Sequence, residues 1–333
     1  MQDIATKAGV GKTTVSLALR NDPRLRTETR ERIQAIAREL GYRPHPLYST
    51  LLSQVRARKP VSQRENLAFL TAFPTRDGWR KSSFVYNEYR EGAAERARQL
   101  GYALEDFWTK EPGMTGRRLT QILETRNIRG LLIAPLPSAR GHLSLEWSKF
   151  AAATLGPSLY KPDLSRATAD HFGGFTMALR KLAKLGYRRI GLMTQRSGEA
   201  RVNYAYTAAL YHYQHTIPAA NRIPPLIRDG LTEPQYRQWF NRHRPDVVMG
   251  GPGLMNWAMA WGLRVPHDLG YADPQRPPWT PWAGIDYHYR VIGAAGVDLV
   301  VGQLQRNESG VPAHPKVVTI RGTWAEGNTV RKQ

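Results

Sequence analysis

The run Gly11-Lys12-Thr13-Thr14 contains the residue types that bind phosphate groups. A nucleotide-binding phosphate loop also needs a glycine four residues ahead of its Gly-Lys-Thr and an apolar strand before it. Thr6 stands at that position, and the five residues before it are too few and too polar for such a strand. The sequence therefore argues against a nucleotide-binding loop.

The same residues fit a helix-turn-helix, in which the second helix begins with small polar and cationic side chains. Apolar spacing predicts helices over residues 2–8, 12–20 and 27–40, with a glycine-rich turn at 9–11. Lys12, Thr13 and Thr14 can then donate hydrogen bonds to bases or phosphates. The alternative is an ordinary three-helix bundle with a solvated basic face.

Charge and composition favour a polyanionic partner. The chain of 333 residues has 48 Lys/Arg and 27 Asp/Glu, a formal charge of +21, and no cysteine. Residues 1–60 hold 12 of these cations and 5 of the acids, about twice the net charge per residue of the remainder. Nucleic acid or an anionic membrane surface would suit such a chain, although arginine-rich coding in a GC-rich genome would also produce the bias. The absence of cysteine excludes disulfides and thiolate metal sites.

No run of about 18 apolar residues predicts a membrane span, and the N-terminus lacks the apolar segment of a secretory leader. We therefore expect a cytoplasmic protein that does not associate with a membrane.

From residue 66 the pattern alternates between strands and helices. Strands are expected at 67–73, 103–108, 130–135, 188–194 and 246–251, and helices at 88–102, 116–127, 174–185 and 199–214. This order is typical of doubly wound parallel sheets. The expected fold is a small all-α helix-turn-helix headpiece followed by an α/β core of two such sheets.

The residues quoted next carry a family resemblance. DIATKAGVGKTTVSLALRND and TRERIQAIARELGYRP resemble the headpiece of the lactose repressor (LacI/GalR) family. ARQLGY, RGLLIAP, LGYRRIGLM, GLRVPHDLGYAD and RGTWAEGNTV follow in the order of that family's periplasmic-binding-protein-like core. The resemblance implies a homodimeric transcription regulator, most often a repressor. It would bind a near-palindromic operator in double-stranded DNA and respond to a small-molecule effector, such as a sugar or related metabolite.

The resemblance also implies roles for headpiece residues. Lys12 and Thr13 would read bases, while Thr14, Ser16, Arg20 and Thr29 would hold backbone phosphates. Leu17 occupies the DNA-facing position where the family usually has Arg, which removes one possible guanine contact. Gly11 replaces the family's usual Ser, so the second helix loses a side-chain cap.

A hinge helix would follow the headpiece and insert an apolar wedge into the minor groove. Leu51 is the best match for the wedge, and Leu52 is the alternative. The competing interpretation is that Leu47 and Leu51 pack only against the partner's hinge.

Four core residues match the family's ligand positions: Asp170, Arg201, Asp273 and Tyr289. Each has a structural alternative, because the two acids could cap helices or turns, the arginine could lie on the surface, and the tyrosine could belong to the core. Gly250-Gly251-Pro252 departs from the family, which usually has a ligand-binding Asn there.

The expected organisation follows from these assignments. The headpiece is 1–44, the hinge and linker 45–65, and the effector-binding and dimerisation core 66–333. The core would comprise two interleaved subdomains, 66–184 with 290–320 and 185–289 with 321–333.

No catalytic motif stands out, and we expect no enzyme activity, cofactor or metal. His212 and His215, three residues apart on an expected helix, are more typical of solvated side chains than of a metal site. The competing function is a small-molecule-binding protein of the solute-binding type without a DNA-regulatory role.

Overall fold

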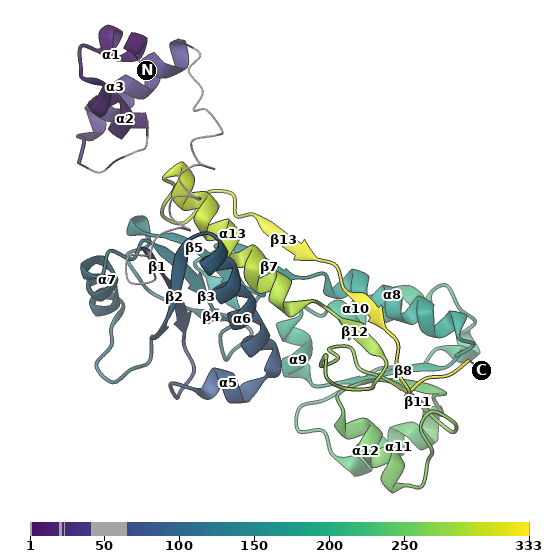
Figure 1. Cartoon of the computed structure of the whole chain (residues 1–333). Coiled ribbons are helices and arrows are strands. Elements are labelled where there is room, and N and C mark those ends of the chain that lie inside the picture. Colours follow the sequence, from purple (N-terminus) through teal and green to yellow (C-terminus); the bar gives the residue numbers. More distant parts are fainter. Residues whose placement is uncertain (1, 20–21, 23, 41–64, 333) are drawn as a thin grey trace.

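The computed structural model describes residues 2–19, 22, 24–40 and 65–332 (Figure 1). Arg20 and the expected hinge, including Leu51, lie outside these residues. Within the described ranges, no helix combines the length and the apolar character that crossing a bilayer requires.

The headpiece consists of three helices around a small core of its own. They are α1 (Gln2–Ala8), α2 (Lys12–Leu19) and α3 (Thr27–Glu39). Ile4, Val15 and Ile33, one from each helix, are buried against one another. The side-chain amide of Gln34 on α3 donates to the carbonyl of Ala18 on α2 at 2.8 Å. The three expected helices are thus present, and the i, i+3, i+4 spacing of their apolar residues explains why they pack together.

A parallel six-stranded sheet forms the first half of the core, in the order β13-β7-β5-β3-β1-β2. Its strands are β1 (Glu65–Thr71), β2 (Tyr102–Trp108), β3 (Gly130–Ile133), β5 (Ala151–Leu155), β7 (Ser165–Ala169) and β13 (Val317–Ile320). Helices α6 (Phe84–Gln99) and α13 (Tyr289–Arg306) cover one face, and α7 (Gly116–Thr125) covers the other. With the short α5 (Gly78–Ser82), these elements are called the first lobe.

A parallel four-stranded sheet, β11-β10-β8-β9, forms the second lobe. Its strands are β8 (Ile190–Thr194), β9 (Leu226–Ile227), β10 (Val247–Gly250) and β11 (Gly270–Ala272). Helices α8 (His171–Lys184) and α10 (Ala205–Gln214) pack on one face, and α11 (Glu233–His243) and α12 (Gly253–Ala260) on the other. The expected fold class, a helical headpiece with two doubly wound sheets, is confirmed.

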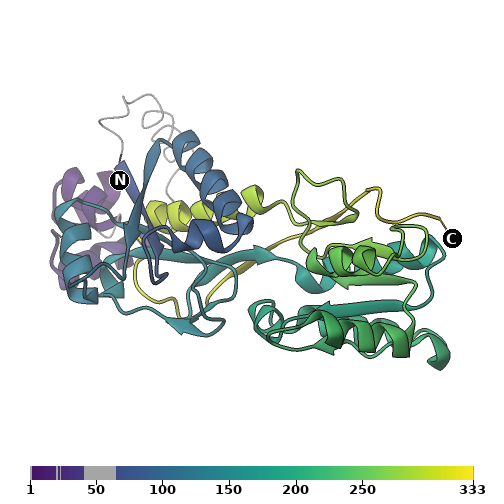
Figure 2. The ribbon, with the colours of Figure 1, turned by 90° about the horizontal axis from the view of Figure 1, so that it is seen from below.

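The chain crosses between the lobes three times (Figure 2). The crossings connect β7 to α8, β12 (Gly284–Asp286) to α13, and β13 to β14 (Thr323–Ala325). Strands β12 and β14 pair antiparallel, and the short β4 (Gly141–His142) and β6 (Leu159–Lys161) form a parallel pair in the first lobe. The sequence-based division left residues 171–184 with the first lobe, whereas the packing of α8 against α10 groups this helix with the second.

One expected helix is divided. Residues 199–214 contain the end of α9 (Arg196–Arg201) and all of α10. Between them Asn203 and Tyr204 adopt left-handed backbone conformations, with φ of 52° and 59°. Such angles end a right-handed helix, and non-glycine residues adopt them at an energetic cost. Periodicity alone predicted one helix, because the helical spacing of apolar residues continues through Asn203 and Tyr204.

Gly11 at the start of α2 offers a test of helix capping. Its carbonyl accepts from the Val15 amide at 3.1 Å, and a Cβ built there would meet nothing within 4 Å. Gly11→Ser should let the hydroxyl cap α2, stabilising it by a few tenths of a kcal/mol. Hydrogen–deuterium exchange of the α2 amides in the full chain should slow by about twofold or less.

Gly9→Ser is the matched control, because Gly9 has a φ of +64° that a serine adopts only with strain. Exchange in α2 should accelerate in this variant. Unchanged exchange in Gly11→Ser would contradict the capping argument.

Candidate nucleic-acid interface and ligand cleft

The outward face of α2 is set by the residues that the helix buries. Val15 and Ala18 point into the headpiece core. Lys12 and Thr13 are exposed, and Ser16 and Leu17, one turn later, are partly exposed. Side chains at i and i+4 lie on one helix face, so these four positions form a continuous outward surface.

The remaining predicted DNA contacts lie nearby in the chain. Thr14 is partly buried on α2, and Thr29 is partly buried in the first turn of α3. Arg20 and Leu51 lie outside the described residues. The structure thus describes six of the eight predicted side chains, five on α2 and Thr29 on α3, and their contacts with DNA stay predictions.

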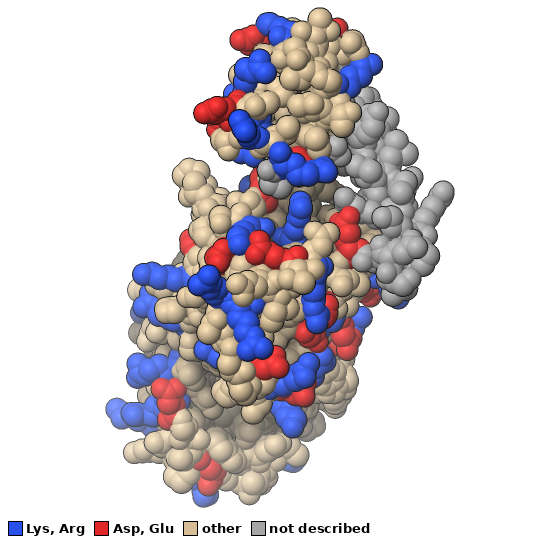
Figure 3. Space-filling view, turned by 90° about the vertical axis from the view of Figure 1, so that its left-hand side faces the viewer, with Lys and Arg blue, Asp and Glu red and all other residues tan. Residues whose placement is uncertain are grey.

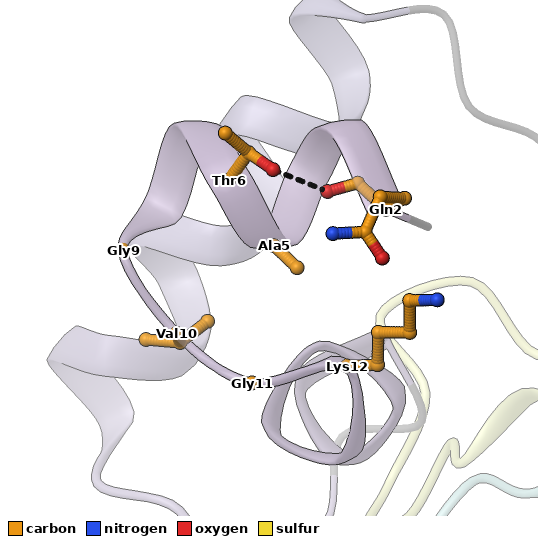
Figure 4. A pocket seen from close by; sticks show the side chains of 7 residues that line it. All are labelled: Gln2, Ala5, Thr6, Gly9, Val10, Gly11 and Lys12. Atoms are coloured by element: carbon orange, nitrogen blue, oxygen red, sulfur yellow. Dashed lines mark hydrogen bonds between the residues drawn. The ribbon is translucent and has the colours of Figure 1, made fainter.

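An open depression of about 410 Å³ lies between α1 and the start of α2. It is lined by Gln2, Ala5, Thr6, Gly9, Val10, Gly11 and Lys12. The Thr6 hydroxyl donates to the Gln2 carbonyl at 3.1 Å, and the side chains of Gln2 and Lys12 extend on the same side (Figure 4). Gln2 is therefore a candidate contact that the sequence reasoning missed, because a single polar residue at a helix start belongs to no motif.

The cations of the headpiece differ in whether they pair with a carboxylate. Lys7 pairs with Glu39 at 2.7 Å, and the ammonium lowers the pKa of that carboxyl. Arg24 pairs with Asp22 at 2.8 Å. Lys12 pairs with no carboxylate in the described part of the chain, which leaves its charge available. On the face seen in Figure 3, Lys and Arg lie over the core as well as the headpiece, so the basic character extends beyond the helix-turn-helix.

The second candidate site lies where carboxyl ends of strands from the two lobes approach each other. Arg201, on α9 after β8, donates through Nη1 to the Tyr86 hydroxyl at 2.9 Å and to the Leu136 carbonyl at 3.1 Å, and through Nη2 to the Pro137 carbonyl. Leu136 and Pro137 follow β3, and Tyr86 is on α6. Arg201 is therefore an interlobe residue rather than a surface arginine.

Asp273 lies directly after β11 and is 4% exposed. Its Oδ1 accepts from the Gln275 amide at 2.8 Å, and its Oδ2 accepts from the Tyr271 hydroxyl at 3.3 Å. Burial raises the pKa of this carboxyl to about 6, against the opposing effect of these hydrogen bonds. It belongs to the second lobe and makes no hydrogen bond to Arg201.

Asp170 and Tyr289 have the surroundings of a helix cap and of a core side chain, the two alternatives to ligand binding. Asp170 caps α8, since its Oδ1 accepts from the Gly173 amide at 2.9 Å. Tyr289 is 5% exposed, and its ring packs edge-on against Phe84 and Tyr89. Its buried hydroxyl has no hydrogen-bond partner in the structure. A ligand would reach the Tyr289 hydroxyl only if neighbouring side chains moved, whereas Asp170 is only partly buried.

An aromatic cluster that the sequence reasoning did not identify surrounds the crossings. His171 contacts Tyr206 and Tyr287 edge-on, with ring centroids 5.7 and 5.0 Å apart. Burial lowers the pKa of His171 to about 4, so its imidazole is neutral at pH 7. These residues are far apart in the chain and share no motif, so only the fold brings them together.

The departure at Gly250 has a steric reason. A Cβ at Gly250 would lie 2.4 Å from the Met193 carbonyl oxygen, and the Gly250 carbonyl accepts from the Tyr271 hydroxyl at 3.0 Å. The close approach of β10 to β8 therefore requires glycine. Gly251 faces open space.

A metal centre finds no support in residues 2–19, 22, 24–40 and 65–332. They contain no group of three or more His, Cys, Asp or Glu side chains able to hold a metal ion.

Comparison with known proteins matches the headpiece to one family and the whole chain to transcriptional repressors. Residues 1–45 match the sequence profile "Bacterial regulatory proteins, lacI family". The chain is 24% identical to the HTH-type transcriptional repressor PurR of Klebsiella pneumoniae (strain 342) over 349 aligned positions, covering 96% of each chain. It is 26% identical to the repressor CytR of Escherichia coli (strain K12), covering 93% of this chain and 91% of CytR.

Solved structures agree on the fold. The lac repressor dimer bound to operator and the anti-inducer ONPF superposes with a TM-score of 0.57 and 18% identity, covering 98% of this chain and 97% of the repressor. The transcriptional regulator CelR in complex with cellobiose superposes with a TM-score of 0.55 and 17% sequence identity, covering 98% of each chain. Residues 1–45 thus match the lacI family of bacterial regulatory proteins, and the chain as a whole is similar in sequence to transcriptional repressors and in fold to solved regulators.

Proposed function

We propose that this protein is a sequence-specific DNA-binding transcription regulator of the repressor type. As a homodimer in the cytoplasm it binds a near-palindromic operator, and a small molecule held between the lobes modulates its affinity. The observation that carries the proposal is the exposed α2 face, with Lys12 and Thr13 at its start, attached to a two-lobed core. It acts by binding rather than by catalysis.

The related structures support both halves of this proposal. The lac repressor structure is of a dimer on operator DNA, and the CelR structure holds cellobiose. In this chain Lys12 and Thr13 would contact bases, and Thr14, Ser16 and Thr29 would contact phosphates. The charged α2 face makes a solute-binding protein without DNA function the weaker alternative.

A sugar or related metabolite suits the chemistry of the cleft. Aromatic rings offer faces for stacking, and Arg201 and Asp273 offer a hydrogen-bond donor and acceptors for hydroxyl groups. These two residues are the proposed polar contacts, and Asp273, at 4% exposed, would reach a ligand only when the groups around it move. Tyr289 would contribute only after displacement of the packed rings, whereas Asp170 already uses one carboxylate oxygen as a helix cap.

Selection from a randomised pool of duplexes of about 20 base pairs tests the DNA function directly. The full-length protein should recover a two-fold symmetric site and hold it above random DNA as salt increases. If added salt lowered the affinity equally for all sequences, binding would reflect counterion release alone, and this result would contradict the proposal.

Lys12→Ala tests base reading at the start of α2. Affinity for the selected site should fall by about 1–3 kcal/mol, with a much smaller loss on random DNA, because a base contact discriminates between sequences. Fluorescence anisotropy on both duplexes measures the difference. Lys7→Ala is the matched control, since this headpiece cation is occupied by Glu39. If Lys12→Ala lowered the affinity for both duplexes equally, the Lys12 side chain would contact a backbone phosphate rather than a base.

Asp273 and His171, whose pKa values are shifted by desolvation, predict opposing effects of pH on stability. Between pH 3.8 and about 6, folded Asp273 keeps a proton that the unfolded chain has lost, so its contribution to stability decreases with rising pH, by ~3 kcal/mol in total. The pKa of His171 is lowered from 6.5 to about 4. Between these values the unfolded chain binds the proton, so the His171 contribution increases with rising pH.

Asp273→Asn should therefore leave the His171 effect unopposed. The free energy of unfolding in urea should increase more from pH 4 to 6.5 in this variant than in the wild type. Above pH 6 the variant should also be the more stable protein, because no buried carboxylate has to ionise. Asp77→Asn, at an exposed carboxylate, should keep the wild-type pH profile. An Asp273→Asn profile parallel to that of the wild type would exclude the buried carboxyl as its source.

A further inference from the structure

The guanidinium of Arg201 joins the two lobes. It belongs to the second lobe, yet the three acceptors of its hydrogen bonds, on Tyr86, Leu136 and Pro137, belong to the first. A cationic donor makes stronger hydrogen bonds than a neutral one, and a planar guanidinium engages several acceptors at once. The contact thus favours the lobe orientation seen in this structure.

Two of the three acceptors, on Leu136 and Tyr86, are held in place by contacts within the first lobe. Leu136 is 3% exposed, and its amide donates to the Ser158 hydroxyl at 2.8 Å. Tyr86 is 9% exposed, and its ring packs against Phe73 with centroids 5.8 Å apart. Little conformational freedom remains to be lost when the contact forms.

Glu199, two residues before Arg201 on α9, fixes the turn that follows Arg201. Its side chain is fully buried, and Oε2 accepts from the Thr207 amide at 3.2 Å and from the Thr207 hydroxyl at 2.5 Å. Thr207 lies in the first turn of α10, where Tyr204 at the N-cap provides no side-chain cap. Glu199 therefore caps α10 from α9 and fixes the corner beside Arg201.

We propose that Arg201 is an interlobe latch, positioned by Glu199, that holds the lobes in this orientation without ligand. A ligand entering the cleft must replace the bonds to Tyr86, Leu136 and Pro137 with its own. The lobe equilibrium would respond only to the difference between the two sets of bonds. This inference rests on the proposed ligand site and concerns its regulation.

The absence of cysteine makes the interlobe distance directly measurable. Glu111 follows β2 in the first lobe and Arg228 follows β9 in the second, and both are exposed. Spin labels on Glu111→Cys and Arg228→Cys of the full chain, measured by double electron–electron resonance, report the orientation of the lobes without DNA or ligand.

Arg201→Met keeps the aliphatic stem and removes the donors. The ratio of long to short interlobe distances should increase by about tenfold or more, the factor for losing a charge-assisted hydrogen bond. Arg201→Lys should give an intermediate shift. Arg180→Met, at an exposed arginine on α8, is the control and should match the wild type. A wild-type distance distribution in Arg201→Met would overturn the latch.

Three further variants keep the test decisive if Arg201→Met does not fold. Tyr86→Phe removes one acceptor and keeps the ring, so a smaller shift toward long distances is expected, and an unchanged distribution counts against the latch. Glu199→Gln keeps an acceptor for Thr207 and should retain the wild-type distances, whereas Glu199→Ala should lengthen them. If Glu199→Ala lowered the thermal stability but left the interlobe distances unchanged, Glu199 would act only as a helix cap and would not position Arg201.

Failure of the latch would not affect the DNA proposal, because the distance measurement contains neither duplex nor effector. Failure of the duplex selection would equally leave the lobe distances as an independent result.

Discussion

Parallel pairing is the constraint on which the core depends. All strands of the six-stranded and four-stranded sheets described here run parallel, so the carboxyl ends of each sheet lie along one edge. Ligand sites in such folds form outside that edge. Arg201 after β8, Asp273 after β11 and Leu136 after β3 all take their positions from this rule.

Interleaving of the chain then couples the two lobes. β13 comes from the end of the chain and pairs with β7 in the first sheet, and α13 returns from the second lobe to pack against α6. Three crossings run side by side, and His171, Tyr287 and Tyr289 lie directly on them. A change in lobe orientation must therefore alter the packing of these rings, which gives ligand binding a physical route to the rest of the molecule.

The region where the lobes meet retains ionisable groups that burial makes costly. Glu199 and Asp273 are nearly inaccessible to water, and desolvation raises the pKa of both carboxyls. A core chosen for stability alone would contain apolar side chains at such positions. The headpiece shows the opposite arrangement, since its core is apolar and its charged groups face solvent. The two candidate sites thus use charge differently, one for attracting a polyanion and the other for a directed contact.

The sequence by itself determined the local elements and the class of fold. Apolar spacing located the three headpiece helices and five of the ten strands described in the two core sheets. The dense motif around Lys12 indicated the family, because both signals lie within short stretches of chain. It also left open the alternatives of cap and core packing for Asp170 and Tyr289. The tertiary structure alone decided that Arg201 reaches the first lobe, that Glu199 caps α10 and that Gly250 has no room for a side chain. Each of these depends on segments that are distant in the chain and meet only when the sheets pack, which no local pattern encodes.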